Sequence, residues 1–596
     1  MRPLTFQLAD AFRAAIQTAL GFDADPQVTP VQNTAFGDYQ CNAAMGLAKR
    51  AVEAVGGKPN PRATAERIVA ALDLGAMAED VSIAGPGFIN VRLSPAWVAA
   101  QLSSNAADDR LGVEPAPAPV RTVVDYSGPN IAKQMHVGHL RSTIIGDAIA
   151  RVLEFQAHEV IRQNHLGDWG TQFGMLIAHL RSTVAGAAGF QAADAMHVQP
   201  PHPTHHIEDL EQFYREAKER FDREPAFQDE ARAIVVQLQG GGEEELKLWR
   251  LIVDETRLHY QPIYERLGVG LREEHERGES FYNEMLAEVV HDLKDAGVAE
   301  RSEGAIAIFS DNFGAPLLIE KTGGGYLYAT TDLAAIRYRV KELRARRLIY
   351  VHDSRQVQHF AQVFEAAKRA GWAESVWLEF APFGTMLGED GKPFKTRTGG
   401  TVKLKDLLDE AEERAFALVS EKNPTMPETQ RREIARTVGI GAVKYADLSK
   451  DRTGDYMFSW DKMLSLEGNT GPYLQYVYTR VRSIFRKAAE SGTSASLFEK
   501  DTASELVLNA AQEITLAKSL LRFGEIIEVM GRELKPHHLC TYLYDVAGAF
   551  SSFYENCSVL QSEGNTRLSR LRLCDATART MQIGLALLGI STLEQM

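Results

Sequence analysis

The strongest constraint in this sequence is a short apolar segment that leads through a histidine-bearing turn into a long amphipathic stretch. Residues 123–125 are typical of a buried strand, and residues 144–153 are typical of an amphipathic helix. Between them lie His136, Gly138 and His139. Repeated strand–turn–helix units build a parallel, doubly wound sheet. The pattern therefore predicts that architecture, with a ligand site where the helix begins.

The two histidines suit a phosphate group. Residues i and i+3 share a helix face, so His136 and His139 are predicted to point to the same side. A helix start presents free backbone N–H groups and a partial positive charge, which favour an anion. Gly138 lets a base or ribose approach the backbone, and neutral imidazole N–H groups can donate to phosphate oxygens. Histidines on the surface or in the core also give this pattern. Other motifs must therefore decide whether this is a phosphate site.

A glycine-punctuated basic loop far downstream is the second candidate nucleotide element. Residues 388–400 read GEDGKPFKTRTGG and include Lys392, Lys395 and Arg397. A loop of this kind can close over a triphosphate and offset the charge on its β- and γ-phosphates. A solvated basic loop is the alternative that the residues alone leave open.

The residues around the histidines resemble a known family. Residues 129–133 (Pro-Asn-Ile-Ala-Lys) precede the pair and residues 140–143 (Leu-Arg-Ser-Thr) follow it. This stretch resembles the HIGH region of class I aminoacyl-tRNA synthetases, and within that class it looks most like arginyl-tRNA synthetase. The basic loop stands where the class has KMSKS. It departs from KMSKS because Phe-Lys-Thr-Arg replaces the central lysine pattern, as in some bacterial-type members.

The resemblance implies that a lysine before HIGH shares the work of the altered loop, and Lys133 is that lysine here. His136, Gly138 and His139 are then the ATP contacts of the first motif. Lys392, Lys395 and Arg397 are the candidates of the second motif, and which of them meets the pyrophosphate stays open.

The resemblance also implies an arginine pocket. A guanidinium is a planar, permanent cation with five donors, so a selective site needs carboxylates and planar acceptors. In residues 326–335 an aromatic side chain stands four residues before an acid, at a predicted strand–helix junction. A packed tyrosine and an N-cap aspartate are the local alternatives. The family pattern assigns the pocket to Asn130 for the amino or carboxylate end, Tyr328 for the stem or the guanidinium, Asp332 and Glu279 as acids, and Gln356 as a polar contact.

Two further stretches match the family pattern. Residues 165–174 (HLGDWGTQFG) are interpreted as a scaffold beside the site, since Gly and Trp suit close packing. Residues 468–480 open a helix with tyrosines and arginines, which can stack bases and meet phosphates. Tyrosines that face a helix core are the alternative. The candidate tRNA contacts are Tyr473, Gln475, Tyr476 and Arg480.

The predicted fold class is α/β, with a Rossmann-like (HUP-type) parallel-sheet catalytic domain, an α+β N-terminal module and an all-α C-terminal bundle. The alternation of strands and helices is predicted to resume with strands at 305–309, 317–319 and 348–351. One helical stretch is predicted over 502–533. The predicted domains are an N-terminal tRNA-contacting module at 1–112, a Pro/Ala linker at 113–121, the catalytic domain at 122–402 with an insertion at about 183–262, a helical stem-contact region at 403–466 and the helical anticodon-binding domain at 467–596.

Composition excludes several classes of protein. The net charge is −14, from 65 Lys and Arg against 79 Asp and Glu, so a nucleic-acid partner requires basic residues gathered on one face. No window approaches the run of about 20 apolar residues that spans a bilayer, and the N-terminus lacks a signal-peptide pattern. The four cysteines form no CxxC pair. We therefore expect a cytoplasmic protein without a membrane partner or bound zinc. A monomer is expected as well, although no sequence feature bears on the oligomeric state. A metal at His202, His205 and His206 is not expected, because no Cys or carboxylate lies at a fixed spacing nearby.

The resemblance covers nearly the whole chain and implies an arginine–tRNA ligase. The substrates would be L-arginine, ATP with Mg²⁺ and tRNA(Arg), activation would require bound tRNA, and no editing domain is expected. The alternatives are a class I synthetase for another amino acid such as cysteine, an HxGH nucleotidyltransferase, and a non-catalytic tRNA-binding paralogue. Cysteinyl enzymes usually hold zinc through paired cysteines, which this chain lacks.

Overall fold

The computed structural model describes residues 2–31, 33–53, 58–106, 108–170, 172–186, 210–322, 324–394, 402–490 and 506–596. The chain divides into two compact units. The first joins Met1–Pro117 with Ser465–Leu587 and Ser591–Met596, and the second joins Ala118–Leu464 with Leu588–Ile590. Each unit is therefore assembled from segments that lie far apart in the sequence.

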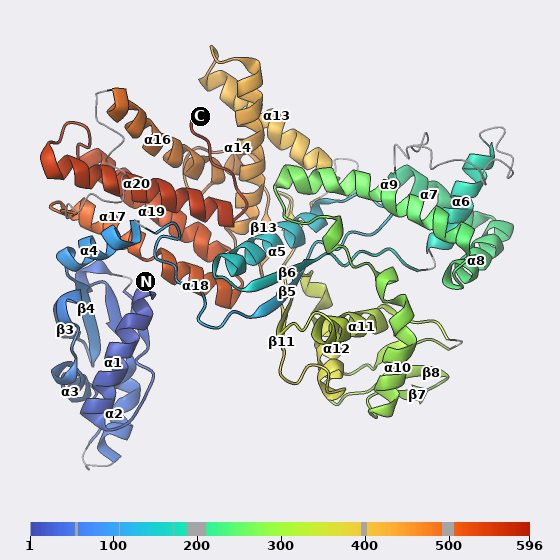
Figure 1. Cartoon of the computed structure of the whole chain (residues 1–596), viewed down its shortest axis with the longest axis horizontal. Helices are drawn as coiled ribbons and strands as arrows, with labels where there is room; N and C mark the ends of the chain where they lie inside the picture. The colour runs from blue at the N-terminus through green and yellow to red at the C-terminus, as the bar shows by residue number, and fades with distance from the viewer. Residues whose placement is uncertain are drawn as a thin grey trace. The chain divides into compact units, whose positions relative to one another are not determined.

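A parallel sheet forms the centre of the second unit (Figure 1). Its strands lie in the order β11 (Trp377–Phe380), β10 (Arg347–Tyr350), β5 (Arg121–Asp125) and β6 (Glu159–Gln163). On one face, Val123 and Leu348 of the sheet pack with Leu333 of α11 (Tyr328–Lys341) and Val363 of α12 (Val357–Arg369). The helix that follows β5 is α5 (Val137–Phe155), which is buried along most of its length. The predicted parallel sheet is confirmed.

A small antiparallel sheet, of order β7-β8-β9, accompanies the parallel one. It consists of β7 (Glu300–Ser302), β8 (Ala305–Ile308) and β9 (Leu317–Glu320), and it packs with α10 (Leu286–Asp295). The prediction that residues 305–309 and 317–319 continue the parallel alternation is therefore wrong. A parallel pair needs a crossover of a dozen or more residues, and the link between β8 and β9 is too short for one.

The region of the predicted insertion is a group of helices, the first of which begins before residue 183 (Figure 1). Its elements are α6 (Gln172–Gly186), α7 (Leu210–Arg223), α8 (Pro225–Gln239) and α9 (Glu243–Leu267). Helix α9 ends at Gly268, whose left-handed backbone (φ 62°) stops the helix. It therefore extends past residue 262, where the insertion was predicted to end.

The second unit ends in helices that carry one further strand pair. Its helices are α13 (Leu404–Lys422), α14 (Glu428–Leu448) and α15 (Trp460–Met463). Strand β12 (Met386–Leu387) runs parallel to β13 (Tyr456–Met457), which lies in a region predicted to be helical. The buried Lys444 of α14 donates to the carbonyls of Leu267 and Gly589, at 2.6 Å each. Burial lowers the pKa of this ammonium to about 8. The hydrogen bond to Gly589 thereby attaches Leu588–Ile590 to this unit.

The first unit combines an antiparallel sheet with a helical bundle. The sheet order is β1 (Val28–Pro30), β2 (Tyr39–Cys41), β4 (Phe88–Leu93) and β3 (Ala78–Ala84). The helices are α1 (Leu4–Leu20), α2 (Ala43–Glu53), α3 (Pro61–Ala71), α4 (Pro95–Ala106), α16 (Gly471–Glu490), α17 (Ala511–Leu521), α18 (Phe523–Glu533), α19 (His537–Asn556) and α20 (Gly564–Leu587). Tyr39 donates to Glu525 at 2.9 Å and Lys518 to Asp38 at 2.7 Å, which joins the sheet to the bundle.

The helical stretch before α19 differs from its prediction. The single helix predicted over 502–533 is two helices, α17 and α18, which meet at Arg522. Residues 502–505 lie outside the described residues. Among the helices that the structure describes, none is long and apolar enough to cross a membrane.

Candidate nucleotide and amino-acid site

The histidine pair forms the cap of α5. His136 is the N-cap residue, and its Nδ1 accepts the N–H of Gly138 at 3.0 Å. His139 Nδ1 in turn accepts the N–H of His136 at 3.1 Å, and the two ring centroids are 4.0 Å apart. The prediction that both rings point to one side is confirmed. Because each Nδ1 accepts a hydrogen bond, a neutral ring carries its proton on Nε2 and can donate it outward.

The prediction that this helix start offers free backbone N–H groups is wrong. Val137 donates its N–H to the carbonyl of Val402 at 3.1 Å, and His139 donates to the carbonyl of His136 at 2.8 Å. The N–H of Gly138 is taken by the His136 ring. A phosphate would therefore meet the two imidazole N–H groups rather than the backbone.

Electrostatics keep both rings neutral near pH 7. Burial lowers the pKa of His139 to about 3, and the charges of His136 and Lys133 act in the same direction. Burial and Lys133 also lower the pKa of His136. Gly138 is required by the packing, since a Cβ there would lie 2.8 Å from the His136 ring. The geometry therefore supplies two neutral donors beside the lysine ammonium.

The segment that follows the second nucleotide motif pairs with the first motif. The second one starts after β12, where Leu387 and Pro393 form an antiparallel bridge and the N–H of Gly388 donates to the carbonyl of Lys392 at 2.8 Å. The Lys392 side chain is exposed. Where the described chain resumes, Lys403 forms an antiparallel bridge with His136. The candidates Lys395 and Arg397 lie outside the described residues.

Helix α5 is also held by contacts of its buried polar side chains, which the sequence did not predict. The buried Arg141 lies 3.0 Å from Asp447 and donates to the carbonyl of Gly454 at 3.1 Å, just before β13. Ser142 donates to the carbonyl of Val351 at 2.6 Å, at the end of β10. The histidine motif, β10 and the segment beside β12 are thus held as one body.

The predicted acid and aromatic of the arginine pocket lie one turn apart on α11. Tyr328 is the first residue of the helix and 72% exposed, so it is not a packed tyrosine. The N-cap is Leu327, so Asp332 is not an N-cap either. Instead, His359 of α12 donates from Nε2 to Asp332 at 2.6 Å. Both local alternatives are therefore excluded, and a histidine partner was missed although it stands three residues after Gln356.

The position of α11 is fixed beneath the pocket. Arg339, which is fully buried, donates to Asp125 at 2.8 Å and to Gln163 at 2.6 Å. These acceptors end β5 and β6. Since ligands of parallel sheets bind outside the carboxyl ends of the strands, Arg339 aligns the helix with that edge.

Gln356 ends a short 3-10 helix, η6 (Ser354–Gln356), that follows β10. Its side chain is exposed. Asp353 caps this turn by accepting the N–H of Arg355 at 2.9 Å. The predicted polar contact therefore lies at the same edge of the sheet as the turn after β5.

The predicted scaffold at residues 165–174 joins two parts of the pocket. Ile131 donates its N–H to Gly167 at 3.1 Å, and Glu279, which begins the 3-10 helix η5 (Glu279–Met285), donates to Leu166 at 3.0 Å. A Cβ at Gly167 would collide with the amide oxygen of Asn130. Asn130 and Glu279 are thus held by one segment, as a scaffold requires.

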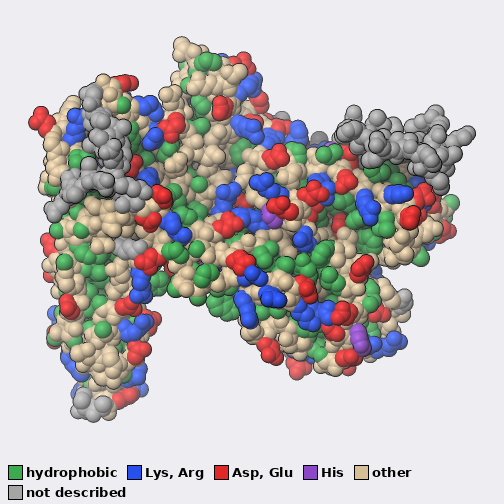
Figure 2. Space-filling model, in the orientation of Figure 1, with side chains coloured by type: hydrophobic (Ala, Val, Ile, Leu, Met, Phe, Trp, Pro, Cys, Tyr) green, Lys and Arg blue, Asp and Glu red, His purple; other side chains and the backbone are tan. Residues whose placement is uncertain are grey.

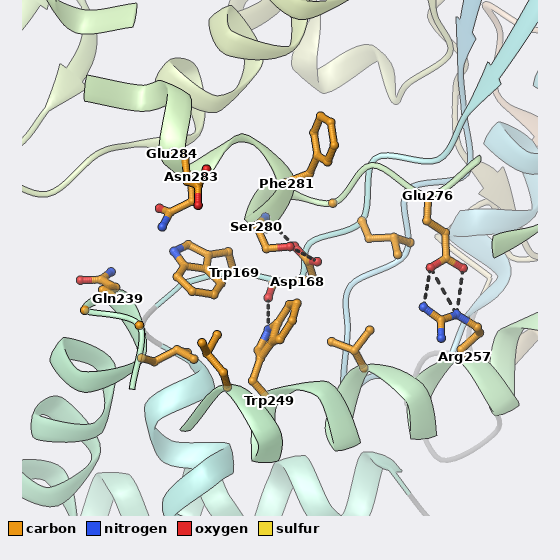
Figure 3. A pocket seen from close by; sticks show the side chains of 17 residues that line it. Asp168, Trp169, Gln239, Trp249, Arg257, Glu276, Ser280, Phe281, Asn283 and Glu284 are labelled. Carbon is orange, nitrogen blue, oxygen red and sulfur yellow. Dashed lines mark hydrogen bonds and ion pairs between the residues drawn. The ribbon is translucent and has the colours of Figure 1, made fainter. Parts of the chain in front are cut away.

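Asp168 and Ser280 complete this scaffold (Figure 3). Asp168 accepts the Ser280 N–H at 2.9 Å and its hydroxyl at 2.6 Å, and Trp249 of α9 donates to the Asp168 carbonyl at 2.7 Å. These residues line a cleft of about 620 Å³ that also includes Trp169. Glu279 is not among the lining residues, although its neighbours are.

Glu279 and Asp332 are close enough to influence each other. Burial, together with the charges of Asp168 and Asp332, raises the pKa of Glu279 to about 7. A site where neighbouring carboxylates repel one another suits a cationic ligand.

The candidate tRNA contacts divide by their position on α16. Tyr476 is 43% exposed and Tyr473 is half-buried, 5.9 Å from the Tyr544 ring. Arg480 lies over the ring of Tyr554 at 4.5 Å. Gln475 is fully buried and donates to the carbonyl of Ser591 at 2.8 Å. Its prediction as a tRNA contact is corrected to a packing role, because helix phase points it inward.

Surface charge is mixed on the face that Figure 2 shows, where basic and acidic side chains lie interspersed. Within the described part of the chain, no group of three or more His, Cys, Asp or Glu side chains could hold a metal ion. The four cysteines are buried free thiols. His202, His205 and His206 lie outside the described residues.

Three family models match the chain. They are "tRNA synthetases class I (R), catalytic domain" over residues 102–460, "DALR anticodon binding domain" over 474–596 and "Arginyl tRNA synthetase N terminal domain" over 7–93. Among curated proteins, the arginine–tRNA ligase of Chromobacterium violaceum is 51% identical over 592 residues, 98% of each chain. That of Laribacter hongkongensis is 50% identical over 601 residues, 100% of each.

Solved structures give the same likeness. Arginyl-tRNA synthetase from Plasmodium falciparum superposes with a TM-score of 0.85 at 31% identity, and covers 100% of both chains. The enzyme from Thermus thermophilus has a TM-score of 0.80 at 25% identity, again over 100% of both chains.

Proposed function

This chain belongs to the class I arginyl-tRNA synthetases, and on that premise we propose how its own residues divide the work. It is an arginine–tRNA ligase, which uses ATP to activate L-arginine and transfers the arginyl group to tRNA(Arg). The observation that supports our assignment of residues best is the hydrogen bond between the histidine motif and the segment just after the second loop, from Val137 to Val402.

In the first step, an α-carboxylate oxygen of arginine attacks the α-phosphorus of ATP, and the bond to the pyrophosphate oxygen breaks. We assign His136 and His139 to donate from Nε2 to phosphate oxygens. Lys133 offsets the charge that develops on the leaving pyrophosphate, together with the second-motif cations, Lys392, Lys395 and Arg397. Catalysis is by positioning and charge stabilisation, without a protein nucleophile.

Arginine is held at the carboxyl edge of the sheet. Asp332 and Glu279 face the guanidinium, Tyr328 covers the aliphatic stem or the guanidinium, Asn130 takes the amino or carboxylate end, and Gln356 adds a polar contact. The partly buried Asp332–His359 hydrogen bond leaves the other carboxylate oxygen of Asp332 for the guanidinium.

In the second step, the 2′-hydroxyl of the terminal adenosine attacks the arginyl carbonyl, and AMP leaves. Exposed Tyr476, half-buried Tyr473 and Arg480 are our candidate tRNA contacts on α16. Mg²⁺ would enter on the phosphates of ATP and neutralise part of their charge, because Mg²⁺ is usually bound through substrate phosphates. The proposal includes a monomer that works in the cytoplasm, where tRNA is charged, and light scattering of the purified protein would test the oligomeric state.

Arginine affinity is expected to depend on pH through Glu279. Its pKa of about 7 means that the carboxyl is mostly protonated below that pH, and a guanidinium must then displace a proton to bind. KM for arginine should rise by up to about tenfold per pH unit below 7 and level off above it. The check is KM measured between about pH 5.5 and 8.5. A Glu279→Gln variant whose KM keeps the same pH profile would contradict this assignment.

The function is tested by ATP–pyrophosphate exchange with each of the twenty amino acids, with and without a tRNA(Arg) transcript. Exchange is expected with arginine alone and should rise with tRNA. Exchange with another amino acid would contradict our pocket. No exchange under any condition would favour a tRNA-binding protein without catalysis.

A further inference from the structure

Helix α7 of the insertion presents one side to its neighbours and another to the nucleotide motif. Leu210, Phe213 and Ala217 are buried, and the Phe213 ring lies 5.0 Å from His179 of α6. Positions 213 and 217 are one turn apart and share a face. The helix is therefore docked on the insertion by that face, and residues 211 and 214 are left for other partners.

Tyr214 contacts the lysine that precedes the histidine motif. The Nζ of Lys133 lies 4.4 Å from the centroid of the Tyr214 ring, within the range of a cation–π interaction. The charge of the same ammonium lowers the pKa of both His136 and His139. The Lys133 ammonium thus contacts the Tyr214 ring and acts on both imidazoles.

The turn that carries Lys133 is held by a second helix of the insertion. Ala132 has a left-handed backbone (φ 61°), which is unfavourable for a residue with a Cβ. Its N–H donates to the hydroxyl of Thr256 on α9 at 3.0 Å. The insertion therefore fixes the backbone of this turn through α9 and the side chain at its end through α7.

The same helix contacts the segment that follows the second nucleotide motif. Glu211 lies 3.7 Å from the ammonium of Lys403, whose backbone forms a bridge with His136. The charge of Glu211 also raises the pKa of His136, against the effects of burial and of Lys133. Helix α7 thus contacts both Lys133, before the first motif, and Lys403, after the second.

We propose that Tyr214 is a positioning residue for Lys133, so that helix α7 of the insertion completes the ATP site. The ring acts on the reaction through the lysine: it restricts the ammonium to the side of the motif where the leaving pyrophosphate gains charge. Without the ring, the long and exposed side chain of Lys133 would lose rotamer freedom on binding the phosphates. Contact with the ring restricts the side chain before ATP binds, so less entropy is lost at that step. The inference rests on the catalytic role proposed above for Lys133.

The test compares Tyr214→Leu with Tyr214→Phe in arginine-dependent ATP–pyrophosphate exchange, with tRNA(Arg) transcript present. Leucine removes the aromatic face, whereas phenylalanine keeps it. We expect Tyr214→Leu to lower kcat about twofold to fivefold, as the loss of one exposed cation–π contact implies, with KM for arginine unchanged. Tyr214→Phe should restore most of the rate.

A matched control lies on the same helix. The Nζ of Lys218 lies 5.7 Å from the centroid of the Phe221 ring, and Lys218 is paired with Asp222 on the same helix. Phe221→Leu removes the same kind of contact and should leave kcat unchanged. Equal melting temperatures of the three variants and the parent protein would separate positioning from folding.

Lys133→Ala and the double variant Lys133→Ala/Tyr214→Leu complete the cycle. Lys133→Ala should cost at least about tenfold in kcat, and the leucine should then have no further effect. If Lys133→Ala is harmless, the proposed role of the lysine and this inference both fail. If Lys133→Ala is costly but Tyr214→Leu behaves like Tyr214→Phe, or lowers the rate equally with and without Lys133, the inference fails alone.

Discussion

Replacing Asp332 with asparagine is expected to lower kcat/KM for arginine by roughly 30- to 1,000-fold, mainly through KM. Truncating one partner of a hydrogen-bonded charge pair usually costs about 2–4 kcal/mol. Asparagine keeps the shape and an acceptor for His359, so the loss reports the missing negative charge opposite the guanidinium. The measurement is ATP–pyrophosphate exchange against arginine concentration.

Asp292→Asn is the matched control for that change. Asp292 also contacts α11, since it lies 2.8 Å from Arg337, but it stands outside the pocket. This variant should leave KM for arginine near that of the parent protein. If Asp332→Asn raised KM for ATP as much as KM for arginine, the assignment of Asp332 to the guanidinium would be wrong.

The second large effect is expected at His139. Asparagine there can still accept the N–H of His136, as Nδ1 does, but it lacks the outward N–H that Nε2 carries. Removal of one donor to developing charge typically lowers kcat by about 10²–10³-fold, so His139→Asn should have an effect of that size. His139→Gln places an amide N–H near the lost position and should recover part of the rate. Single-turnover formation of the adenylate is the measurement.

His275 offers an unusually close control for His139. It caps a short 3-10 helix in the same way, with its Nδ1 accepting the N–H of Arg272 at 2.9 Å, and it lies outside the proposed site. His275→Asn should leave kcat unchanged. A loss in His139→Asn no larger than in His275→Asn would mean that the ring only caps the helix.

Local patterns were read well from the sequence. The side that His136 and His139 share follows from their spacing, whereas Phe88–Leu93 forms the predicted strand but does not alternate, because Ile89, Asn90 and Val91 are all buried. Their geometry depends on neighbours within a few residues. The antiparallel pairing of β8 and β9 was predictable from the sequence. The link between the two strands is too short for the crossover that a parallel pair needs.

Long-range partners were not predictable in this way. The backbone N–H of Val137 is occupied by Val402, and no local rule connects two residues so far apart. The same holds for Lys133 and Tyr214, and for Arg141 and Asp447. Gln475 was misjudged for a related reason: its side-chain chemistry suits RNA, but the position of its helix decides whether it reaches water.

Each unit combines segments that lie far apart in the sequence, which affects how the protein folds during synthesis. Tyr39 of the N-terminal sheet bonds to Glu525, and Lys444 is satisfied by Gly589, so each unit contains bonds to residues that the ribosome adds late. At about 5–20 residues per second, the roughly 350 residues between the two parts of the first unit take tens of seconds to synthesise. During that time the nascent sheet lacks its helical partner. Folding in the order of synthesis cannot finish either unit before release, and nascent chains of this protein should engage chaperones until the last turn has emerged.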